Sequence, residues 1–158
     1  MEMRPWMVQT AHEYLKASRL LFTNNLHVSS TVTAAIGVEI LLKSFLVEID
    51  GEKGGLGEKY FFDNKKYKIK NSGHNLLELF NAISDNIKSE LNFYKYEEYL
   101  SKYYQTPFLD DRYPYEKQAS GGYSDALTDI GEEMVSTVIK WYKDNKCNDP
   151  WIEKYPDE

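Results

Sequence analysis

Cysteine is almost absent from this sequence: Cys147 is the only one in 158 residues. A single cysteine cannot form an intramolecular disulfide, and it excludes a cysteine-rich zinc site. Long apolar runs are missing as well. The best candidate for a membrane span, residues 32–49, is interrupted by Glu39, whereas a span needs about 18 apolar residues. Residues 1–10 carry one charge of each sign and no apolar run, unlike a signal peptide. The sequence therefore predicts a cytoplasmic protein that does not enter the membrane.

Positive charge is also scarce. The 19 basic residues are outnumbered by 25 acidic ones, which gives a net charge of −6. This balance argues against a protein that coats nucleic acid through bulk electrostatics. With 42% hydrophobic and 28% charged residues, the composition is that of a globular protein and not of a disordered chain. We predict a single domain over residues 1–158.

Apolar residues recur at helical spacing in most of the chain. The predicted helices run from about Pro5 to Asn24, Ser29 to Ile49, Asn75 to Leu91, Phe93 to Gln105, and from Ser124 to Asp149. The second, with Ser29 or Ser30 as its N-cap, is apolar over almost its whole circumference. Such a helix is typical of the centre of a bundle.

The remaining segments are predicted as connections. Residues 50–73 contain five glycines, and two aromatic-rich stretches, 60–62 and 67–69, predict a small hairpin around residues 63–66. Residues 107–122 read as a loop, and residues 147–158 as an acidic tail without periodicity. The expected fold is all-α, an up-down helical bundle of four to five helices with a small β-hairpin insertion between the second and third helices.

Motifs typical of cofactor binding or metal binding are missing. The sequence has no Gly-rich phosphate loop before a helix, no nucleophile elbow and no paired-histidine metal motif. We therefore expect neither a cofactor nor a bound metal.

Three short motifs resemble the HEPN family when taken together. Residues 34–43, Ala-Ala-Ile-Gly-Val-Glu-Ile-Leu-Leu-Lys, are similar to that family's second-helix pattern of a small residue, Glu, Leu and Lys. Residues 73–79, Gly-His-Asn-Leu-Leu-Glu-Leu, are similar to the start of its third helix, and residues 112–116, Arg-Tyr-Pro-Tyr-Glu, to the loop before its last helix. The motifs follow the expected order over about residues 8–145.

The resemblance implies a helical bundle that commonly dimerises through its long helices. Many members are metal-independent ribonucleases of toxin–antitoxin or defence systems, and others are non-catalytic modules associated with RNA or nucleotides. In the nucleases, an Arg that stabilises phosphate charge is followed, about four to six residues later, by a His that assists attack by the ribose hydroxyl. Here the only histidines are His12, His27 and His74, which all precede Arg112. The catalytic motif does not carry over, so we predict no catalytic residue.

Glu39, Lys43 and His74 are candidate binding residues. Glu39 interrupts an apolar helix, and two interpretations stay open: an ion pair with Lys43 one turn away, or a polar site at a dimer cleft. His74 precedes the third predicted helix, where capping and loop packing compete with a ligand role.

Arg112, Tyr113 and Tyr115 are the candidates in the last loop. The planar fork of Arg112 suits a phosphate, but it can equally hold its own loop by pairing with Asp110, Asp111 or Glu116. The two tyrosines can donate hydrogen bonds to a ligand.

A basic surface is the third candidate. Five lysines against Glu58 and Asp63 leave the hairpin region locally at +3; they are Lys59, Lys65, Lys66, Lys68 and Lys70. Such a cluster meets RNA phosphates in some proteins and is simply a solvated face in others.

These observations favour a catalytically silent HEPN-like module. It would dimerise and bind RNA, a nucleotide or a protein partner such as a nucleotidyltransferase in a defence or toxin–antitoxin setting. The alternative is a metal-independent ribonuclease with a non-standard site, in which Arg112 works with a Tyr or a Glu in place of the His. A purely structural interaction module is the third hypothesis.

Overall fold

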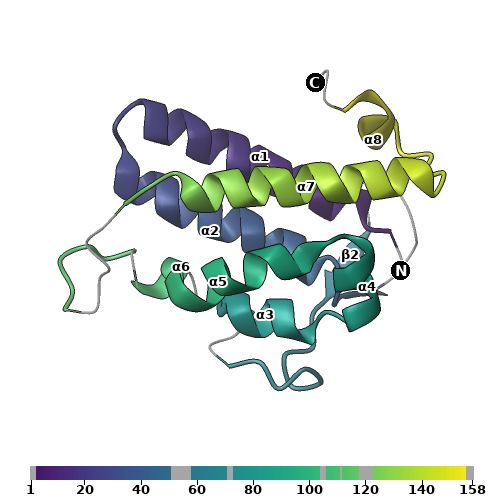
Figure 1. Cartoon of the computed structure of the whole chain (residues 1–158), viewed down its shortest axis with the longest axis horizontal. Helices are drawn as coiled ribbons and strands as arrows, with labels where there is room; N and C mark the ends of the chain where they lie inside the picture. Colours follow the sequence, from purple (N-terminus) through teal and green to yellow (C-terminus); the bar gives the residue numbers. More distant parts are fainter. Residues whose placement is uncertain are drawn as a thin grey trace.

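Three long helices form the body of the protein. The computed structural model describes residues 3–50, 58–70, 73–103, 106–110, 112–117 and 123–155. Helices α1 (Pro5–Thr23), α2 (His27–Lys43) and α7 (Ala126–Asp144) lie side by side, with shorter helices below them (Figure 1). The predicted all-α class, with a β-hairpin between the second and third helices, is confirmed. In the part of the chain described here, no helix is long and apolar enough to cross a membrane.

The three helices approach closely because two glycines face Leu15. A Cβ atom added to Gly37 on α2 would lie 3.0 Å from Leu15 Cγ, and one added to Gly131 on α7 would lie 2.5 Å from Leu15 Cδ2. The Leu15 side chain of α1 is fully buried between them. Close-packed interiors have no room for an extra methyl group at such contacts, so the two glycines set the spacing of the bundle.

A buried set of hydroxyl groups joins the same three helices. Ser18 Oγ lies 3.0 Å from Ser30 Oγ and 2.7 Å from Thr128 Oγ1, and Ser30 Oγ donates to the Ser18 carbonyl at 2.9 Å. Each buried hydroxyl therefore has a partner, as its removal from water requires. This role of Ser30 corrects the prediction that Ser29 or Ser30 caps the second helix, because α2 already begins at His27.

Short helical segments lie below the three long helices, and the first and last of these segments pack against α2. They are α3 (Leu76–Ala82), α4 (Asp85–Glu90), the 3₁₀ turn η2 (Phe93–Tyr96), α5 (Glu97–Tyr103) and α6 (Pro107–Asp110). The single helix predicted for residues 75–91 is wrong, since Ile83 and Ser84 have extended backbone angles, with ψ of 135° and 145°. Burial of Ile83 against the core accompanies this break. The loop predicted for 107–122 is also wrong at its start, where Pro107 occupies the first turn of α6.

The hairpin is built from different residues than predicted. Helix α2 ends at Lys43 instead of Ile49, and β1 (Glu48–Asp50) pairs antiparallel with β2 (Lys59–Phe61). The stretch 67–69 is not a strand. Instead, Asp63 Oδ1 accepts from the backbone nitrogens of Lys65 and Lys66 at 3.0 and 3.1 Å, which closes a turn.

The C-terminal segment contains a helix and not only a structureless tail. Asp149 Oδ1 accepts from the backbone nitrogens of Trp151 and Ile152, so the Asp-Pro pair that was expected to end a helix starts α8 (Pro150–Lys154). Helix α7 has already ended at Asp144. Ile152 is fully buried, and α8 packs on α1 and α7, where it lies above the end of α7 in Figure 1. Residues 156–158 lie outside the described part.

Candidate functional site

Glu39 holds two basic side chains that come from different parts of the chain. Its Oε1 accepts from Lys43 Nζ at 2.6 Å, and its Oε2 lies 2.8 Å from His74 Nδ1. The Glu39 side chain is 12% exposed, against 17% for Lys43 and 30% for His74. The ion pair with Lys43 was one of the two predicted interpretations; the contact with His74 was not predicted. Glu39 is thus a nearly buried carboxylate with a charged partner, which such a group requires.

The backbone around His74 fixes the position of its ring. Gly73 has φ of +83°, and a Cβ atom there would lie 2.7 Å from Phe62 Cε1, so only glycine fits. On the other side, Asn75 Oδ1 accepts from the Glu78 backbone nitrogen at 2.9 Å and caps α3. Asn75 performs the capping role that was considered for His74, which leaves the imidazole free to reach Glu39.

Phe108 extends this site to the last loop. Its ring lies 4.9 Å from the His74 ring, at an interplanar angle of 30°, and its centroid is 5.3 Å from the Arg112 guanidinium carbon. Phe108 was missed because residues 107–122 read as a loop. The Pro107 that begins α6 was a usable signal. We refer to Glu39, Lys43, His74, Phe108 and Arg112 as the Glu39 cluster.

Arg112 is held by aromatic rings. Besides Phe108, it contacts Tyr113, with 4.6 Å between the guanidinium carbon and the ring centroid. The predicted alternative, an ion pair within its own loop, is not found for Asp110 or Glu116; the Asp110 carboxylate instead accepts from Thr106. Asp111 lies outside the described residues. Stacking on rings leaves the N–H groups at the edge of a guanidinium available to an anion.

The two candidate tyrosines are exposed beside Arg112. Tyr113 is 38% exposed and Tyr115 is 80% exposed, with 5.9 Å between their ring centroids. An aromatic ring this open to solvent beside an arginine can stack on another flat ring system. Neither tyrosine contacts the Glu39 carboxylate in the described structure.

All five lysines of the predicted basic surface are exposed. One of them is engaged: Lys66 Nζ lies 2.6 Å from Glu48 Oε1, and this hydrogen bond raises the pKa of Lys66 above its ordinary value. The surface borders the Glu39 cluster through two rings, because Lys43 Nζ lies 5.0 Å from the Phe62 centroid and Phe62 stacks on Tyr67 at 6.2 Å. The remaining lysines of the set are Lys59, Lys65, Lys68 and Lys70.

The cluster offers two chemical capabilities. Lys43 and Arg112 supply positive charge against the single carboxylate of Glu39. In a neutral imidazole, a carboxylate at Nδ1 selects the tautomer with its hydrogen on that nitrogen, which leaves Nε2 as an acceptor. Within the described residues, no group of three or more His, Cys, Asp or Glu side chains is arranged to hold a metal ion. Comparison with protein-family models, with curated proteins and with solved structures gave no match.

Proposed function

We propose that the protein is a catalytically silent HEPN-like module that dimerises and binds RNA or a nucleotide at the Glu39 cluster, in a defence or toxin–antitoxin setting. The observation that supports binding is that Arg112 and His74 contact the same ring, Phe108, while Lys43 lies on the other side of Glu39. Through Tyr113, which contacts both Arg112 and Tyr115, all six candidate residues chosen from the sequence belong to one contact network.

RNA or a nucleotide fits this arrangement better than an anion without a base. The guanidinium of Arg112 can bind phosphate oxygens through two N–H groups, and Tyr115 presents an open ring for a base. The neighbouring lysines of residues 65–70 would extend phosphate contacts along a strand. Because the whole chain is negative, binding would be confined to this side of the molecule.

The test is a titration of fluorescently labelled single-stranded RNA, followed by anisotropy at low and raised salt. We expect binding that weakens steeply with salt, since phosphate contacts release counterions. A labelled adenine nucleotide, titrated in parallel, separates a strand ligand from a mononucleotide. Absence of binding to both probes at low salt would contradict the proposal and leave the protein-partner role.

The ribonuclease alternative has one observation in its favour. The sequence places no His after Arg112, yet the His74 ring, which precedes Arg112 in sequence, contacts the same Phe108 ring. When this imidazole is neutral, Glu39 at Nδ1 leaves Nε2 without a hydrogen, as a general base requires. Cleavage of single-stranded RNA without added metal, lost in both His74→Gln and Arg112→Ala, would establish the alternative. Cleavage that survives both changes would come from a contaminant.

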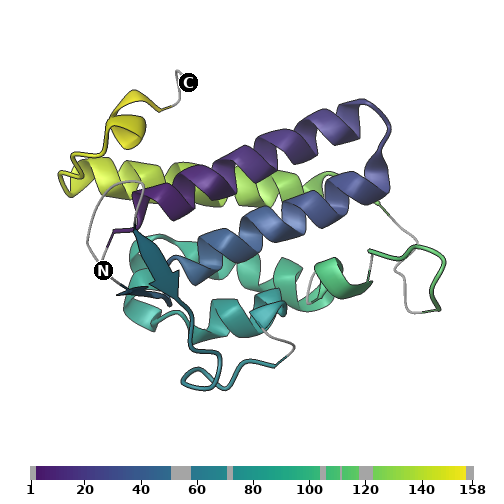
Figure 2. The ribbon, with the colours of Figure 1, turned by 180° about the vertical axis from the view of Figure 1, so that it is seen from behind.

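Dimerisation needs a surface that the chain itself leaves open. The resemblance implies dimerisation through the long helices, but α2 and α7 are packed against α1, α3, α6 and α8 over much of their surface. The outer face of α1 and α2 is not covered by α7 (Figure 2). Thr10 of α1 and Ile40 of α2 line the same pocket on that face. Tyr14, 38% exposed, follows Thr10 by one helical turn, and the half-exposed Ile36 and Thr33 precede Ile40 by one and two turns, so they share the face. We assign the dimer contact to this uncharged patch, the Tyr14 patch.

A further inference from the structure

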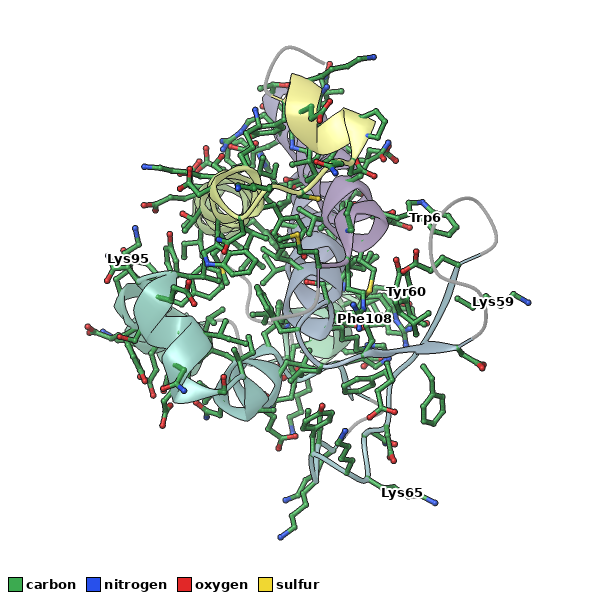
Figure 3. All side chains as sticks on the ribbon, turned by 90° about the vertical axis from the view of Figure 1, so that its right-hand side faces the viewer. Trp6, Lys59, Tyr60, Lys65, Lys95 and Phe108 are labelled. Atoms are coloured by element: carbon green, nitrogen blue, oxygen red, sulfur yellow. The ribbon has the colours of Figure 1, made fainter. Side chains whose placement is uncertain are left out.

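A small pocket lies between α3 and the segment that follows β2. In Figure 3, Lys65 marks this segment at the bottom of the molecule, whereas Trp6, which lines the separate pocket of Thr10 and Ile40, lies at the upper right. The volume is about 270 Å³, below the range of about 300–1,000 Å³ that is usual for drug-sized ligands, so a single ring system fits it best. We call it the Tyr67 pocket; its lining residues are Tyr67, Lys68, Ile69, Glu78, Asn81 and Ala82.

Backbone hydrogen bonds hold the walls of the pocket in place. The Ile69 nitrogen donates to the Asn64 carbonyl at 2.9 Å and closes a turn in which Lys68 takes a left-handed φ of 55°. The Lys70 nitrogen donates to Glu78 Oε2 at 2.7 Å, which ties the segment to α3. The ring of residue 67 is therefore presented by a fixed turn.

Tyr67 supplies a flat wall next to positive charge. Its ring is nearly parallel to that of Phe62, with an interplanar angle of 8° and 6.2 Å between the centroids. Lys66 Nζ lies 5.4 Å from the Tyr67 centroid, and Lys43 Nζ lies 5.0 Å from the Phe62 centroid. Aromatic rings beside basic side chains stack the bases of single-stranded nucleic acids in many proteins. Because Lys43 belongs to the Glu39 cluster, the two rings connect the Tyr67 pocket to that cluster.

The charges of the lining favour a neutral group with hydrogen-bonding edges. Lys68 and Glu78 have opposite charges, so together they select neither an anion nor a cation. The exposed amide of Asn81 donates and accepts hydrogen bonds, whereas the carboxylate of Glu78 only accepts them. Adenine and cytosine match this pair, since each has an amino group that donates beside a ring nitrogen that accepts. Uracil has no amino group.

We propose that the Tyr67 pocket binds one adenine or cytosine base of a single-stranded nucleic acid. The base stacks on Tyr67, Asn81 and Glu78 bond its edge, and the phosphates on either side contact the exposed lysines of residues 65–70. The pocket acts within the proposed function, on which this inference rests. It narrows the ligand from any nucleotide to a strand that reaches from the Glu39 cluster to the hairpin segment.

The experiment compares labelled eight-nucleotide RNAs of adenine, cytosine or uracil by anisotropy at low salt. We expect the wild type to bind the adenine and cytosine strands about tenfold more tightly than the uracil strand. Asn81→Leu should bring this ratio close to one and should retain most of the affinity for uracil. Tyr67→Leu should weaken binding of all three strands by about tenfold, and Tyr67→Phe, which keeps the ring, should restore it.

Asn86→Leu on α4 and Tyr99→Leu on α5 are the matched controls. Both side chains are exposed and lie outside the pocket lining, so neither the affinity nor the base preference should change. A circular dichroism melt verifies that each variant is folded. Because the Asn81 side chain is exposed, the test of base preference does not depend on the stability of Tyr67→Leu.

Three results would overturn the inference and leave the proposed function intact. One is equal affinity of the wild type for the three strands. Another is a base preference that survives Asn81→Leu, which would place the selection elsewhere. The third is a folded Tyr67→Leu variant with unchanged affinity. Failure of all three strands to bind would contradict the proposed function and the base site together.

Discussion

The carboxylate of Glu39 joins two basic side chains that the sequence keeps apart. Lys43 follows it by one helical turn, but His74 reaches it across 35 positions. With a single partner, a nearly buried carboxylate would keep one oxygen unpaired, which costs about 1–3 kcal/mol. Occupation of both oxygens explains why an acidic residue is tolerated inside the most apolar helix of the protein.

Arg112 provides the most direct test of the binding site. We expect Arg112→Ala to weaken single-stranded RNA binding by about tenfold or more, which corresponds to loss of a charged hydrogen bond of about 1.5–3 kcal/mol. The melting temperature should change little, because the Arg112 side chain is exposed and its contacts with described residues are two aromatic rings. Anisotropy titration and a thermal melt measure the two effects. A lower melting temperature with unchanged affinity would show that Arg112 holds its loop and not a ligand.

Gly131 provides a test of the packing. Alanine at this position gains about 1 kcal/mol of helix propensity. Its Cβ atom, however, would meet Leu15 Cδ2 at 2.5 Å and both Leu15 Cδ1 and Val38 Cγ2 at 3.0 Å. Overpacking of this kind costs about 1–3 kcal/mol, and the 2.5 Å contact puts this variant toward the upper end of that range. After the gain in helix propensity is subtracted, we expect a net loss of up to about 2 kcal/mol, or up to roughly 8 °C in melting temperature.

The control for Gly131→Ala is Thr137→Ala, which lies on the same helix away from Leu15. The second variant is Gly131→Ala combined with Leu15→Val, in which the shorter side chain relieves the contact. Leu15→Val with the glycine retained is measured as well. If the double variant melts no higher than the sum of the two single changes in melting temperature predicts, the close approach to Leu15 is not the cause.

At the scale of elements, the imidazole ring of His12 on α1 contacts two aromatic rings at α8. The His12 ring lies 5.5 Å from the Trp151 ring and 5.2 Å from the Tyr155 ring. Burial lowers the pKa of His12, as does the positive charge of Lys16, while Glu132 and Glu13 oppose the shift. The unfolded chain therefore binds a proton more readily than the folded one. The contribution of neutral His12 to the free energy of unfolding is therefore fully present above about pH 6.5, the pKa of histidine in the unfolded chain. It is lost as the pH falls from there toward the lower pKa of the folded state.

We therefore expect the melting temperature to fall between pH 7.5 and pH 5, and to fall less in His12→Phe, which keeps an aromatic ring but cannot be protonated. Tryptophan fluorescence should report the change at α8, because Trp151 contacts His12. The three tryptophans are Trp6, Trp141 and Trp151, so Trp141→Phe isolates the signal further. An identical pH dependence in the wild type and in His12→Phe would exclude His12 as its source.

The basic surface of the hairpin should determine the salt dependence of binding. Joint replacement of Lys66, Lys68 and Lys70 by Gln should reduce the slope of log affinity against log salt by up to about three phosphate contacts, at about 0.7 each on a single strand. Stability should hardly change, because the Lys66–Glu48 pair is exposed and such pairs contribute about 0–1 kcal/mol. Titrations at several salt concentrations measure the slope.

The matched control replaces Lys16, Lys140 and Lys146, which are equally exposed but lie on α1, α7 and the turn after α7. It changes the net charge by the same amount. If both triple variants reduce the slope alike, the effect comes from net charge and not from the hairpin surface.

Long periodic helices were predictable from sequence, and their ends were less so. The apolar spacing of α1, α2 and α7 identified all three. The end of α2 was missed because Leu46 and Ile49 continue the helical pattern, although Ile49 lies opposite Tyr60 in a strand. Similarly, Ile83 fits the stripe of one helix while its extended backbone separates α3 from α4. In each case tertiary packing overrides a local pattern.

The candidate site was partly predictable for a related reason. Glu39 and Arg112 were recognisable as polar residues in unusual surroundings. Their connection through His74 and Phe108 was not, because it depends on how α3 and α6 pack against α2. Long-range contacts of this kind leave no periodic signal in one sequence.

At the scale of the whole molecule, we expect a dimer of about twice the 18.5 kDa chain mass. Gel filtration with light scattering measures the mass. The change Tyr14→Glu should yield a monomer, because it places a charge in the centre of an uncharged patch. The matched control, Trp6→Asp, adds a charge at the pocket end of the same face and should leave the dimer intact. A wild-type monomer at tens of micromolar would contradict the assignment.

The contacts of Leu15 and Ser18 have a consequence for how the chain reaches its fold during synthesis. Ser18 bonds to Thr128, 110 positions later, and Leu15 is enclosed by Gly131. The α1–α2 hairpin therefore leaves the ribosome long before α7. Its apolar inner surface stays exposed until the last third of the chain has been synthesised. Contacts of such sequence separation slow folding, and an apolar surface exposed in the meantime is prone to aggregation. Ribosome-stalled chains that lack α7 should accordingly be the ones that chaperones retain.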